Sequence, residues 1–502
     1  MGESGTGNMR TTRKSGTATE QILARWRVWV PYSLALGDGL ALLVSFYLGR
    51  LPYAFYYGLP PLYVLQHWWG SLAQLNLLLF ILLGVLGISI FFAKGHYARR
   101  KAFWDEAGEI LLVFSLLLGL NAAIAFSGKW AFSRLWLFST WGLAFLVLPA
   151  MRLGVRGMLQ RTGLWVRPVI IIGGGQNALE AMKALDSDSM LGFKVQRILV
   201  PDSTACEKNS FPEDVPVEFL EGDPLASLAR LGNPHVVLAL DVDQWAAQEQ
   251  LVRLLGLNYP NLAIAPPLRG LPLFGLEVMH FFSHEVLMLR VRDNLARLGP
   301  RLIKRIFDVV VASLLVAILS PVLLFLVWRI RSEDSGPAIY SQERVGRGGR
   351  TFRCLKFRSM MVDADARLAE YLSIHPELRE EYEKTCKLKN DPRVTRMGLF
   401  LRRTSLDELP QIFNVLRGEM SLVGPRPVTR RELDEYYGDI AGLYRLVHPG
   451  ISGLWQVSGR SDTTYSERIY LDSWYVKNWS LWYDIVILIR TVGVVFRRQG
   501  AY

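Results

Sequence analysis

Cysteine and charge are both scarce in this sequence. Its 502 residues include only three cysteines, Cys206, Cys354 and Cys386, which are far apart and form no CxxC motif. This scarcity excludes a disulfide framework and a thiolate metal site, and it is typical of a protein in a reducing cytosol. Charged residues make up only 20% of the chain, against 51% hydrophobic residues. That balance predicts membrane segments attached to soluble parts.

Familiar catalytic signatures are absent as well. The sequence contains no HExxH motif, no Walker loop and no recognisable Ser-His-Asp arrangement. The charge that is present is mostly positive, with a formal net charge of +12. Such an excess suits nucleic acid, anionic lipid or a phosphorylated substrate.

Long apolar runs are plentiful in the first third of the chain. Residues 1–20 are polar and rich in Gly, Ser and Thr, with no cleavable signal pattern, which predicts a disordered tail. Four apolar segments follow, each about long enough to cross a ~30 Å hydrocarbon layer, the last two only just. They predict a four-helix transmembrane bundle within residues 21–155, with spans near 28–48, 75–93, 110–126 and 135–151.

The basic residues around these segments set their orientation. Lys and Arg gather before the first span, between the second and third, and after the fourth. The other two loops carry only Arg50 in one, and Lys129 and Arg134 in the other. The positive-inside rule therefore places both ends of the bundle in the cytoplasm.

Strands and helices alternate after the bundle. The run PVIIIGGGQNALEAMKAL from Pro168 is typical of a buried strand, a glycine turn and a helix. Further strands are predicted at 193–200, 235–240 and 262–267. This alternation predicts a small, Rossmann-like parallel α/β domain over residues 165–280.

The glycine turn of this domain has two interpretations. Gly173, Gly175 and Ala178 match a loose dinucleotide fingerprint, with Asp202 as a possible ribose ligand. A tight turn that any three-layer domain needs also explains these residues, and we favour that structural interpretation, with a degenerate cofactor pocket. A polar, basic connector is predicted at 281–300, leading to a C-terminal domain over 301–502.

A fifth apolar stretch, residues 306–328, has basic residues on both flanks and contains Ser320-Pro321. Proline breaks a helix because it lacks an N–H and its ring clashes with the preceding turn. Split there, the arms have ~14 and ~8 residues, or roughly 21 and 12 Å at a 1.5 Å rise, so neither spans alone. We interpret the stretch as a re-entrant helix that dips into the inner leaflet and returns. A proline-kinked span is the alternative.

The last apolar stretch begins at Trp479 and differs from the others. Asp484 and Arg490 interrupt it, and tryptophans stand at its start. This pattern favours a helix that lies at the membrane surface or packs on the domain core, and argues against a crossing.

Cations stand beside Gly and Pro turns in the C-terminal third. Arginine forks suit phosphate oxygens, whereas a basic face on anionic lipid is the simpler alternative. The lipid alternative does not explain why the cations stand at turns and segment starts. These cations are Lys356, Arg358, Arg393, Arg402, Arg403, Arg426 and Arg460.

Two adjacent acids follow in SLDELPQ, residues 405–411. Ser405 and Glu408 form a capping-box pattern, so Asp407-Glu408 could simply begin a helix. Pro410 is awkward for such a helix, and the nearby cations remain unexplained. A helix terminus and arginines would keep Asp407 ionised, as a carboxylate nucleophile requires, and Glu408 could hold a divalent cation on a diphosphate. The pair is therefore either a helix start, a catalytic dyad, or both.

The order of these motifs resembles a known family. The runs KRIFD, KFRSM, DPRVTRMG, TSLDELPQIFNVLRGEMSLVGPRPV, HPGISGLWQVSGR and YLDSWYVKNWS resemble the bacterial polyprenyl-phosphate phosphoglycosyl transferases of the monotopic superfamily. The resemblance covers residues 300–502 or so densely, and the N-terminal part of the chain looks like that of the large, four-span members of the family. KWAFSRLW, GGGQNALEA, FSHEVLMLRV and the ending GAY look like the members that transfer galactose phosphate.

The resemblance implies a two-step transfer. Asp407 would attack the β-phosphate of a UDP-sugar and release UMP, and undecaprenyl phosphate would then take the phosphosugar. Glu408 would bind Mg²⁺. Lys356, Arg402 and Arg426 match positions that hold phosphates in the family. The resemblance leaves the role of one position open, because His448 stands where many relatives carry a basic residue before Pro-Gly.

Three further positions complete the predicted binding set. Asp472 of YLDSWYVKN matches an acidic site position of the family. Arg358 and Arg393 are predicted to contribute to substrate binding alongside the phosphate-holding cations. The dyad and these cations together make a site for a UDP-sugar and a lipid phosphate.

The implied fold and setting follow from the same likeness. The fold class is a membrane α-helical bundle, a Rossmann-like α/β domain and a mainly α-helical (α+β) monotopic catalytic domain with a re-entrant membrane helix. The expected location is the bacterial inner membrane, with the catalytic domain on the cytoplasmic face, in contact with inner-membrane lipids. No nucleic acid is expected as a partner, and small-residue faces on the spans permit a homodimer.

Other functions remain open at this point. The expected product feeds O-antigen, capsule or exopolysaccharide synthesis, with galactose preferred by likeness alone and UDP-glucose as the alternative sugar donor. A membrane-tethered oxidoreductase would need a Tyr-x-x-x-Lys pair in the α/β domain, which is absent. A non-catalytic scaffold of polysaccharide assembly would leave the dyad as a helix cap.

Overall fold

The chain forms two compact units in the computed structural model, Met1–Leu268 and Arg269–Tyr502. The structure describes residues 27–60, 71–129, 133–201, 211–268, 270–273, 276–281, 284–291, 295, 297–374, 391–458 and 464–497. The predicted tail at 1–20, Asp202 and Arg460 lie outside the described residues.

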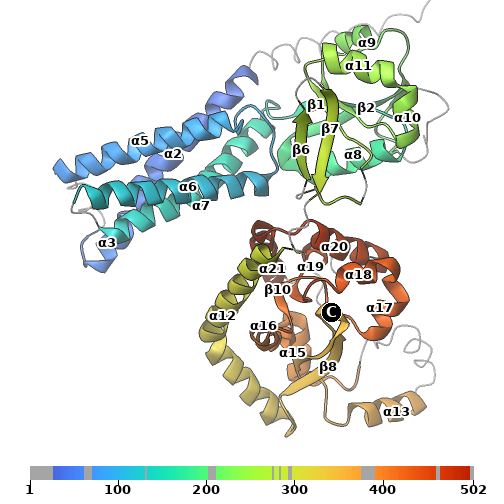
Figure 1. Ribbon diagram of the computed structural model, residues 1–502. Coiled ribbons are helices and arrows are strands. Elements are labelled where there is room, and N and C mark those ends of the chain that lie inside the picture. The colour runs from blue at the N-terminus through green and yellow to red at the C-terminus, as the bar shows by residue number, and fades with distance from the viewer. Residues whose placement is uncertain are drawn as a thin grey trace, which may run out of the picture. The chain divides into compact units, whose positions relative to one another are not determined.

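The first unit begins with four long apolar helices (Figure 1). Helix α2 packs against α5 and α7, and α6 packs against the same two helices, so the four close into a bundle. Outward-facing leucines such as Leu36 and Leu116 are 67% and 66% exposed. All four helices are long and apolar enough to cross a membrane, as predicted. Their bounds are α2 Val30–Leu48, α5 Ser71–Ala93, α6 Phe103–Ser127 and α7 Arg134–Arg161, with a short α3 at Leu51–Tyr56.

Helices α6 and α7 are longer than the predicted spans because they continue through buried ionic residues. Arg152 donates from Nε to Asp38 Oδ1 at 2.8 Å and from Nη1 to Glu106 Oε1 at 2.6 Å. Arg156 donates to the other oxygen of Glu106 at 2.6 Å, and the Tyr97 hydroxyl donates to Asp38 at 2.7 Å. Arg152 and Arg156 are each only 3% exposed. These two arginines, which follow the fourth predicted span, therefore join α2, α6 and α7 through buried ion pairs.

A parallel α/β domain completes the first unit, as predicted. Its five strands lie in the order β3-β2-β1-β4-β5, all parallel. Apolar side chains pack on both faces of the sheet. The short strand β3 was not predicted. The strands are β1 Arg167–Ile172, β2 Phe193–Val200, β3 Val217–Phe219, β4 His235–Leu238 and β5 Leu262–Ile264, and the helices are α8 Gln176–Ser187, α9 Pro224–Arg230, α10 Val242–Ala247 and α11 Glu249–Asn258.

The glycine turn before α8 is explained by packing against the end of β4. Gly173 has φ +150°, and a Cβ there would strike the carbonyl of Ala239. A Cβ on Gly175 would strike the carboxylate of Asp241, which accepts from the Asn177 N–H at 2.9 Å. A carboxylate of the chain itself thus occupies the start of α8, where a dinucleotide-binding domain holds pyrophosphate. The contact supports the structural interpretation of these glycines.

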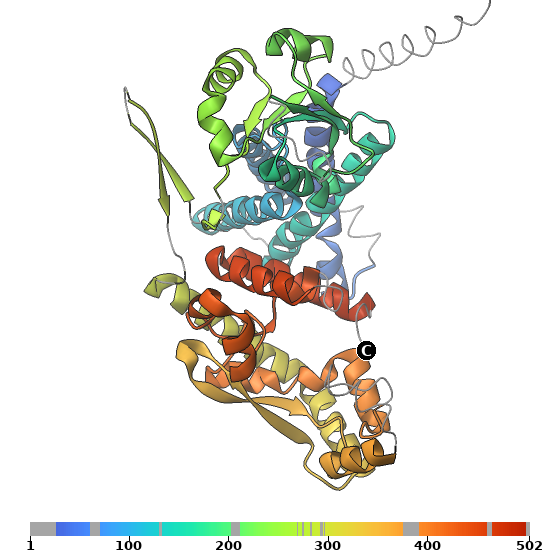
Figure 2. The same cartoon turned by 90° about the vertical axis from the view of Figure 1, so that its right-hand side faces the viewer.

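The second unit begins with an antiparallel hairpin of β6 (Leu276–Phe281) and β7 (His284–Val291). Figure 2 shows it as a long two-stranded ribbon. The predicted connector at 281–300 thus contains a regular strand, β7. The basic residues suggested a linker, but the sequence HEVLMLRV is rich enough in apolar residues to pair as a strand.

The fifth apolar stretch forms one helix, α12, from Leu298 to Glu333. The predicted break into two arms was wrong, since Pro321 lies inside a helix that continues on both sides of it. A single lost hydrogen bond can bend a helix without ending it, and the ribbon of α12 does bend along its length (Figure 1). By length and composition α12 is a fifth helix that could cross a membrane.

Short elements surround the start of α12. Lys304 of α12 donates to Asp484 at 2.7 Å, and the same fully buried carboxylate accepts from Tyr475 and Trp479. Asp484, which interrupts the last apolar stretch, therefore anchors that stretch on the domain core, one of the two predicted outcomes.

The remaining elements of the second unit are β8 Ile339–Val345, β9 Thr351–Phe357, α13 Ala364–Ile374, α15 Arg396–Thr404, η7 Leu406–Glu408, α16 Gln411–Arg417, β10 Ser421–Val423, α17 Arg430–Tyr436, α18 Ala441–Tyr444, β11 Gly450–Ser452, α19 Leu454–Ser458, α20 Tyr465–Lys477 and α21 Leu481–Arg497.

We expect Arg152→Ala to destabilise the bundle by about 3–5 kcal/mol, because it leaves Asp38 buried without a cation and leaves Glu106 with Arg156 alone of its two arginines. The melting temperature of the purified protein in detergent measures this loss. Arg161→Ala is the matched control, since Arg161 is exposed at the end of the same helix. Equal melting temperatures for the two variants would contradict a stabilising role for the buried ion pairs.

Candidate active site

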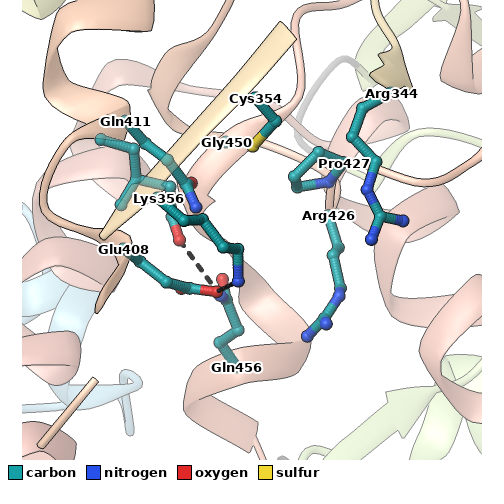
Figure 3. A pocket seen from close by; sticks show the side chains of 10 residues that line it. Arg344, Cys354, Lys356, Glu408, Gln411, Arg426, Pro427, Gly450 and Gln456 are labelled. Atoms are coloured by element: carbon teal, nitrogen blue, oxygen red, sulfur yellow. Dashed lines mark hydrogen bonds and ion pairs between the residues drawn. The ribbon is translucent and has the colours of Figure 1, made fainter. Parts of the chain in front are cut away.

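One wall of the candidate site is the two-stranded sheet of β8 and β9. Alternation along β9 places Cys354 and Lys356 on one face. The antiparallel register pairs Arg344 with Phe352 and Tyr340 with Lys356, so Arg344 shares the face of Lys356. Arg344, Cys354 and Lys356 all line the same pocket (Figure 3).

The acidic pair lies beside strand β9, in a 3-10 turn, η7, between α15 and α16. Ser405 ends α15 in the left-handed conformation, with φ 55°, and its side chain caps nothing. The predicted capping box is therefore wrong. Pro410 is the N-cap of α16, so the regular helix begins only after the pair. The sharp reversal at Ser405 leaves Asp407 and Glu408 on a tight turn facing Lys356.

Lys356 joins the two acids. Its Nζ lies 2.8 Å from Glu408 Oε1 and 3.6 Å from Asp407 Oδ2. Burial alone would lower the pKa of the Lys356 ammonium, but the two carboxylates raise it above its usual value. Burial raises the pKa of Asp407 and the charge of Glu408 adds to it, while Lys356 and Arg402 oppose the shift. The pKa of Asp407 is therefore raised overall, whereas the sequence predicted that the helix terminus and the arginines would favour the ionised form. The prediction did not allow for the burial of the acidic pair.

The pocket continues on the side of Arg426. Figure 3 shows Arg426 and Arg344 across the pocket from Lys356 and Glu408. Arg426 follows Gly424, where any Cβ would strike the backbone of His448 and Gly450. This close approach lets β10 pair in parallel with β11 and fixes the Gly-Pro-Arg-Pro segment. The arginine is therefore held by backbone packing.

Asp472 supports Arg426 from outside the pocket. Its carboxylate is 3% exposed, accepts from the Tyr437 hydroxyl at 3.0 Å and accepts from the Arg426 backbone. Burial raises the pKa of Asp472 to about 7, although Arg468 lowers it. Asp472 thus positions the arginine segment and does not line the pocket that Lys356 and Glu408 line.

The other predicted cations have partners of their own. Arg358 pairs with Asp334 at 3.0 Å, and Arg393 pairs with Asp391 at 2.7 Å. Arg402 donates to the Ser359 hydroxyl at 2.9 Å and lies close enough to Asp407 to affect its pKa. None of these three lines the pocket in which Lys356, Glu408 and Arg426 meet.

His448 lies outside the pocket lining. Burial and the charges of Arg347, Arg305, Lys304 and Arg301 lower the pKa of its imidazole to about 4. It is therefore neutral at physiological pH and supplies no positive charge at this position.

Sequence reasoning missed the four other pocket residues with polar or thiol side chains, Arg344, Cys354, Gln411 and Gln456. The period-two spacing of Cys354 and Lys356 was the one available signal, since alternate strand residues share a face. Burial raises the pKa of the Cys354 thiol to about 11, so it stays protonated and is not a nucleophile. The two glutamines carry no pattern that separates them from surface residues.

Comparison with known proteins identifies the family. A family model described as bacterial sugar transferase matches residues 299–498. The chain is 45% identical to a UDP-galactose-lipid carrier transferase of Erwinia amylovora, over 84% of this chain and 88% of that protein. It is 42% identical to an undecaprenyl-phosphate galactose phosphotransferase of Salmonella typhimurium, over 81% of this chain and 84% of that protein.

A more distant relative carries a different sugar in its name. The UDP-glucose:undecaprenyl-phosphate glucose-1-phosphate transferase of Escherichia coli is 31% identical over 70% of this chain and 72% of that protein. All three likenesses extend well beyond the 299–498 match and take in much of the first unit. The chain therefore belongs to the bacterial sugar transferases and is a polyprenyl-phosphate phosphoglycosyl transferase.

Proposed function

We propose that the protein transfers galactose 1-phosphate from UDP-galactose to undecaprenyl phosphate, as the first membrane step of O-antigen, capsule or exopolysaccharide synthesis. The observation that carries this proposal is the pairing of Lys356 with both acids of the dyad, beside a pocket that Arg426 also lines. A carboxylate nucleophile flanked by cations suits transfer of a phosphorylated group. The names of the relatives at 45% and 42% identity favour galactose over the glucose named at 31%.

Asp407 acts as the nucleophile of the first step. Its side chain is only 16% exposed and lies beside the Lys356 ammonium. A carboxylate oxygen attacks the β-phosphorus of the UDP-sugar, the bond from that phosphorus to the bridging oxygen breaks, and UMP leaves with the electron pair. A raised pKa makes the ionised carboxylate more basic, and a more basic oxygen is the better nucleophile. The phosphosugar is then attached to Asp407.

Undecaprenyl phosphate accepts the group in the second step. One of its phosphate oxygens attacks the same phosphorus, and the Asp407 oxygen leaves as a free carboxylate. The product is the lipid diphosphate sugar. Lys356 and Arg426 lie on opposite sides of the pocket, and their positive charges can bind the two phosphate groups that meet there.

Glu408 is the residue that would hold Mg²⁺. Mg²⁺ is usually bound by one or two carboxylates together with substrate phosphates. Among the residues with described positions, no group of three His, Cys, Asp or Glu could hold a metal by itself. Glu408 nevertheless presents an oxygen that already attracts a cation, Lys356, at 2.8 Å. The residues present therefore fit Mg²⁺ shared with a diphosphate, whose charge the ion would neutralise.

The anchoring of α12 supports a re-entrant course through the inner leaflet. Near its start, Lys304 and Asp308 bond to Asp484 and Ser421 of the second unit. Near its end, Ile330 packs with Leu401 in the same unit. A straight span would separate these two ends by the width of the membrane. Exposed apolar residues midway, with Ile318 at 71% and Leu324 at 70%, would then face lipid, on the cytoplasmic side of the inner membrane.

We expect Asp407→Asn to lower UMP release from UDP-galactose by at least ~1,000-fold, since it removes the attacking carboxylate. Membranes with undecaprenyl phosphate and Mg²⁺ are assayed with a panel of UDP-sugars. Asp439→Asn, which changes an exposed aspartate of the same unit, is the control and should keep full activity. Unchanged release by Asp407→Asn would favour a non-catalytic scaffold, and wild-type release with UDP-glucose alone would overturn the choice of sugar.

Chelation of divalent cations should reduce UMP release to background, and added Mg²⁺ should restore it. Glu408→Gln should raise the Mg²⁺ concentration needed for half-maximal rate by about tenfold or more, because one ionic ligand is lost. The rate is measured across a Mg²⁺ titration for both proteins. Turnover that persists in excess chelator would show that the reaction needs no divalent cation.

A further inference from the structure

Unpaired polar atoms gather beside the Arg426 side of the pocket. Over the ranges that the structure describes, the indole Nε1 of Trp455, the hydroxyl of Tyr465 and two guanidinium nitrogens of Arg468 are buried and form no hydrogen bond. The amide oxygen of Gln456 is also buried and unpaired. Buried donors are almost always satisfied in native proteins, so several unpaired donors in one place indicate a ligand that accepts from them.

Aromatic contacts hold these groups together. The guanidinium carbon of Arg468 lies 5.0 Å from the ring centres of both Trp455 and Tyr465. Arg426 lies 5.2 Å from the same Trp455 ring. Trp455 is only 7% exposed, so two cations share one buried indole. Arg426 and Gln456 also line the pocket of Lys356 and Glu408, which makes the cluster continuous with the active site (Figure 3).

The nearby carboxylates are committed elsewhere. Asp472, one turn along α20 from Arg468, accepts from the Tyr437 hydroxyl and the Arg426 backbone. Glu432 accepts from Arg344 at 3.0 Å and from Thr429 at 2.7 Å. In the described part of the chain, neither acid forms an ion pair with Arg468, although both lie near enough to interact with its charge. Among the described residues, Arg426 and Arg468 therefore have no carboxylate in direct ion-pair contact.

The chemistry of the cluster selects one kind of ligand. Two guanidinium groups, an indole N–H and a phenol O–H offer several donors and net positive charge. An apolar ligand would leave all of them unpaired, and a metal cation would be repelled. A phosphate has enough acceptor oxygens and the right charge to satisfy them together.

We propose that Arg468, with Arg426 at the indole of Trp455, binds a second phosphate group of the reactants. This inference rests on the proposed function. This phosphate has two possible sources. One is the nucleotide phosphate that leaves as part of UMP, and the other is the monophosphate of the lipid acceptor. Lys356 and Glu408 serve the transferred group, and Arg468 serves the phosphate on the other side of the reacting bond.

Four single variants test the site. Arg468→Gln removes the charge and Arg468→Lys keeps it without the planar fork. Trp455→Phe and Tyr465→Phe each remove one unpaired donor; Tyr465→Phe keeps the ring, whereas Trp455→Phe replaces the indole with a smaller phenyl ring. Arg431→Gln is the control, because the side chain of Arg431 is 88% exposed. KM is measured for UDP-galactose and for undecaprenyl phosphate separately, and melting temperature is measured with and without UDP.

We expect Arg468→Gln to raise one KM by about tenfold or more, Arg468→Lys to recover part of the loss, and the control to match the wild type. A change in KM for UDP-galactose assigns the nucleotide phosphate, and a change in KM for undecaprenyl phosphate assigns the lipid phosphate. Tyr465→Phe should melt no lower than the wild type without ligand, because its lost donor has no protein partner. Whichever phosphate is assigned, each Phe variant should raise the same KM as Arg468→Gln by a smaller factor.

Two results overturn the inference, and both differ from failure of the proposed function. Wild-type KM values for both substrates in a folded Arg468→Gln protein would show that Arg468 binds neither phosphate. A lower melting temperature of Tyr465→Phe without ligand, with unchanged KM values for both Phe variants, would show that the cluster is purely structural. A wild type that releases no UMP from any UDP-sugar would instead contradict the proposed function.

Discussion

The ammonium of Lys356 between two adjacent acids is the interaction on which the site depends. Two carboxylates in a half-buried turn repel each other, and burial further disfavours their ionised forms. Lys356 offsets both effects, at 2.8 Å from Glu408 and 3.6 Å from Asp407. The rest of the local fold serves this contact: the β8–β9 register presents the lysine, and the left-handed residue Ser405 turns the acids toward it. Removal of the lysine would leave the dyad as an unneutralised pair.

Backbone constraints hold the opposite side of the pocket just as firmly. Gly424 and Gly450 pack so closely that neither can carry a side chain. The pairing of β10 with β11 that results fixes Arg426, and Asp472 secures the same segment through its backbone. A flexible arginine would lose conformational freedom on binding each phosphate. An arginine fixed in advance avoids much of that loss, which suits a site that binds two phosphorylated reactants in turn.

The sequence was sufficient for features that repeat along the chain or depend on local chemistry. Hydropathy revealed the four helices of the bundle, and alternation of strand and helix revealed the parallel sheet. The order of polar motifs pointed to Lys356, Glu408 and Arg426, which the structure brings to one pocket. Features decided by distant partners were not accessible. Arg152 looked like a loop charge because Asp38 and Glu106 come from other helices, and Arg358 looked free because Asp334 precedes it by 24 residues. Ser405 matched a helix cap, yet the end of α15 forces it into a turn.

The link between α12 and Arg426 gives the proposed re-entrant helix a chemical consequence. Asp308 of α12 accepts from the Ser421 hydroxyl at 2.7 Å and from the Leu422 N–H at 3.2 Å. These residues begin β10, which leads within four residues to Arg426. A lipid phosphate carries its charge at the interface between headgroups and water, so a cation that receives it must lie at that depth. With α12 inserted as proposed, the Asp308 contacts set the depth of Arg426 directly. The insertion depth of α12 and the depth of the phosphate site are then fixed together, because the Asp308 contacts join α12 directly to the segment that carries Arg426.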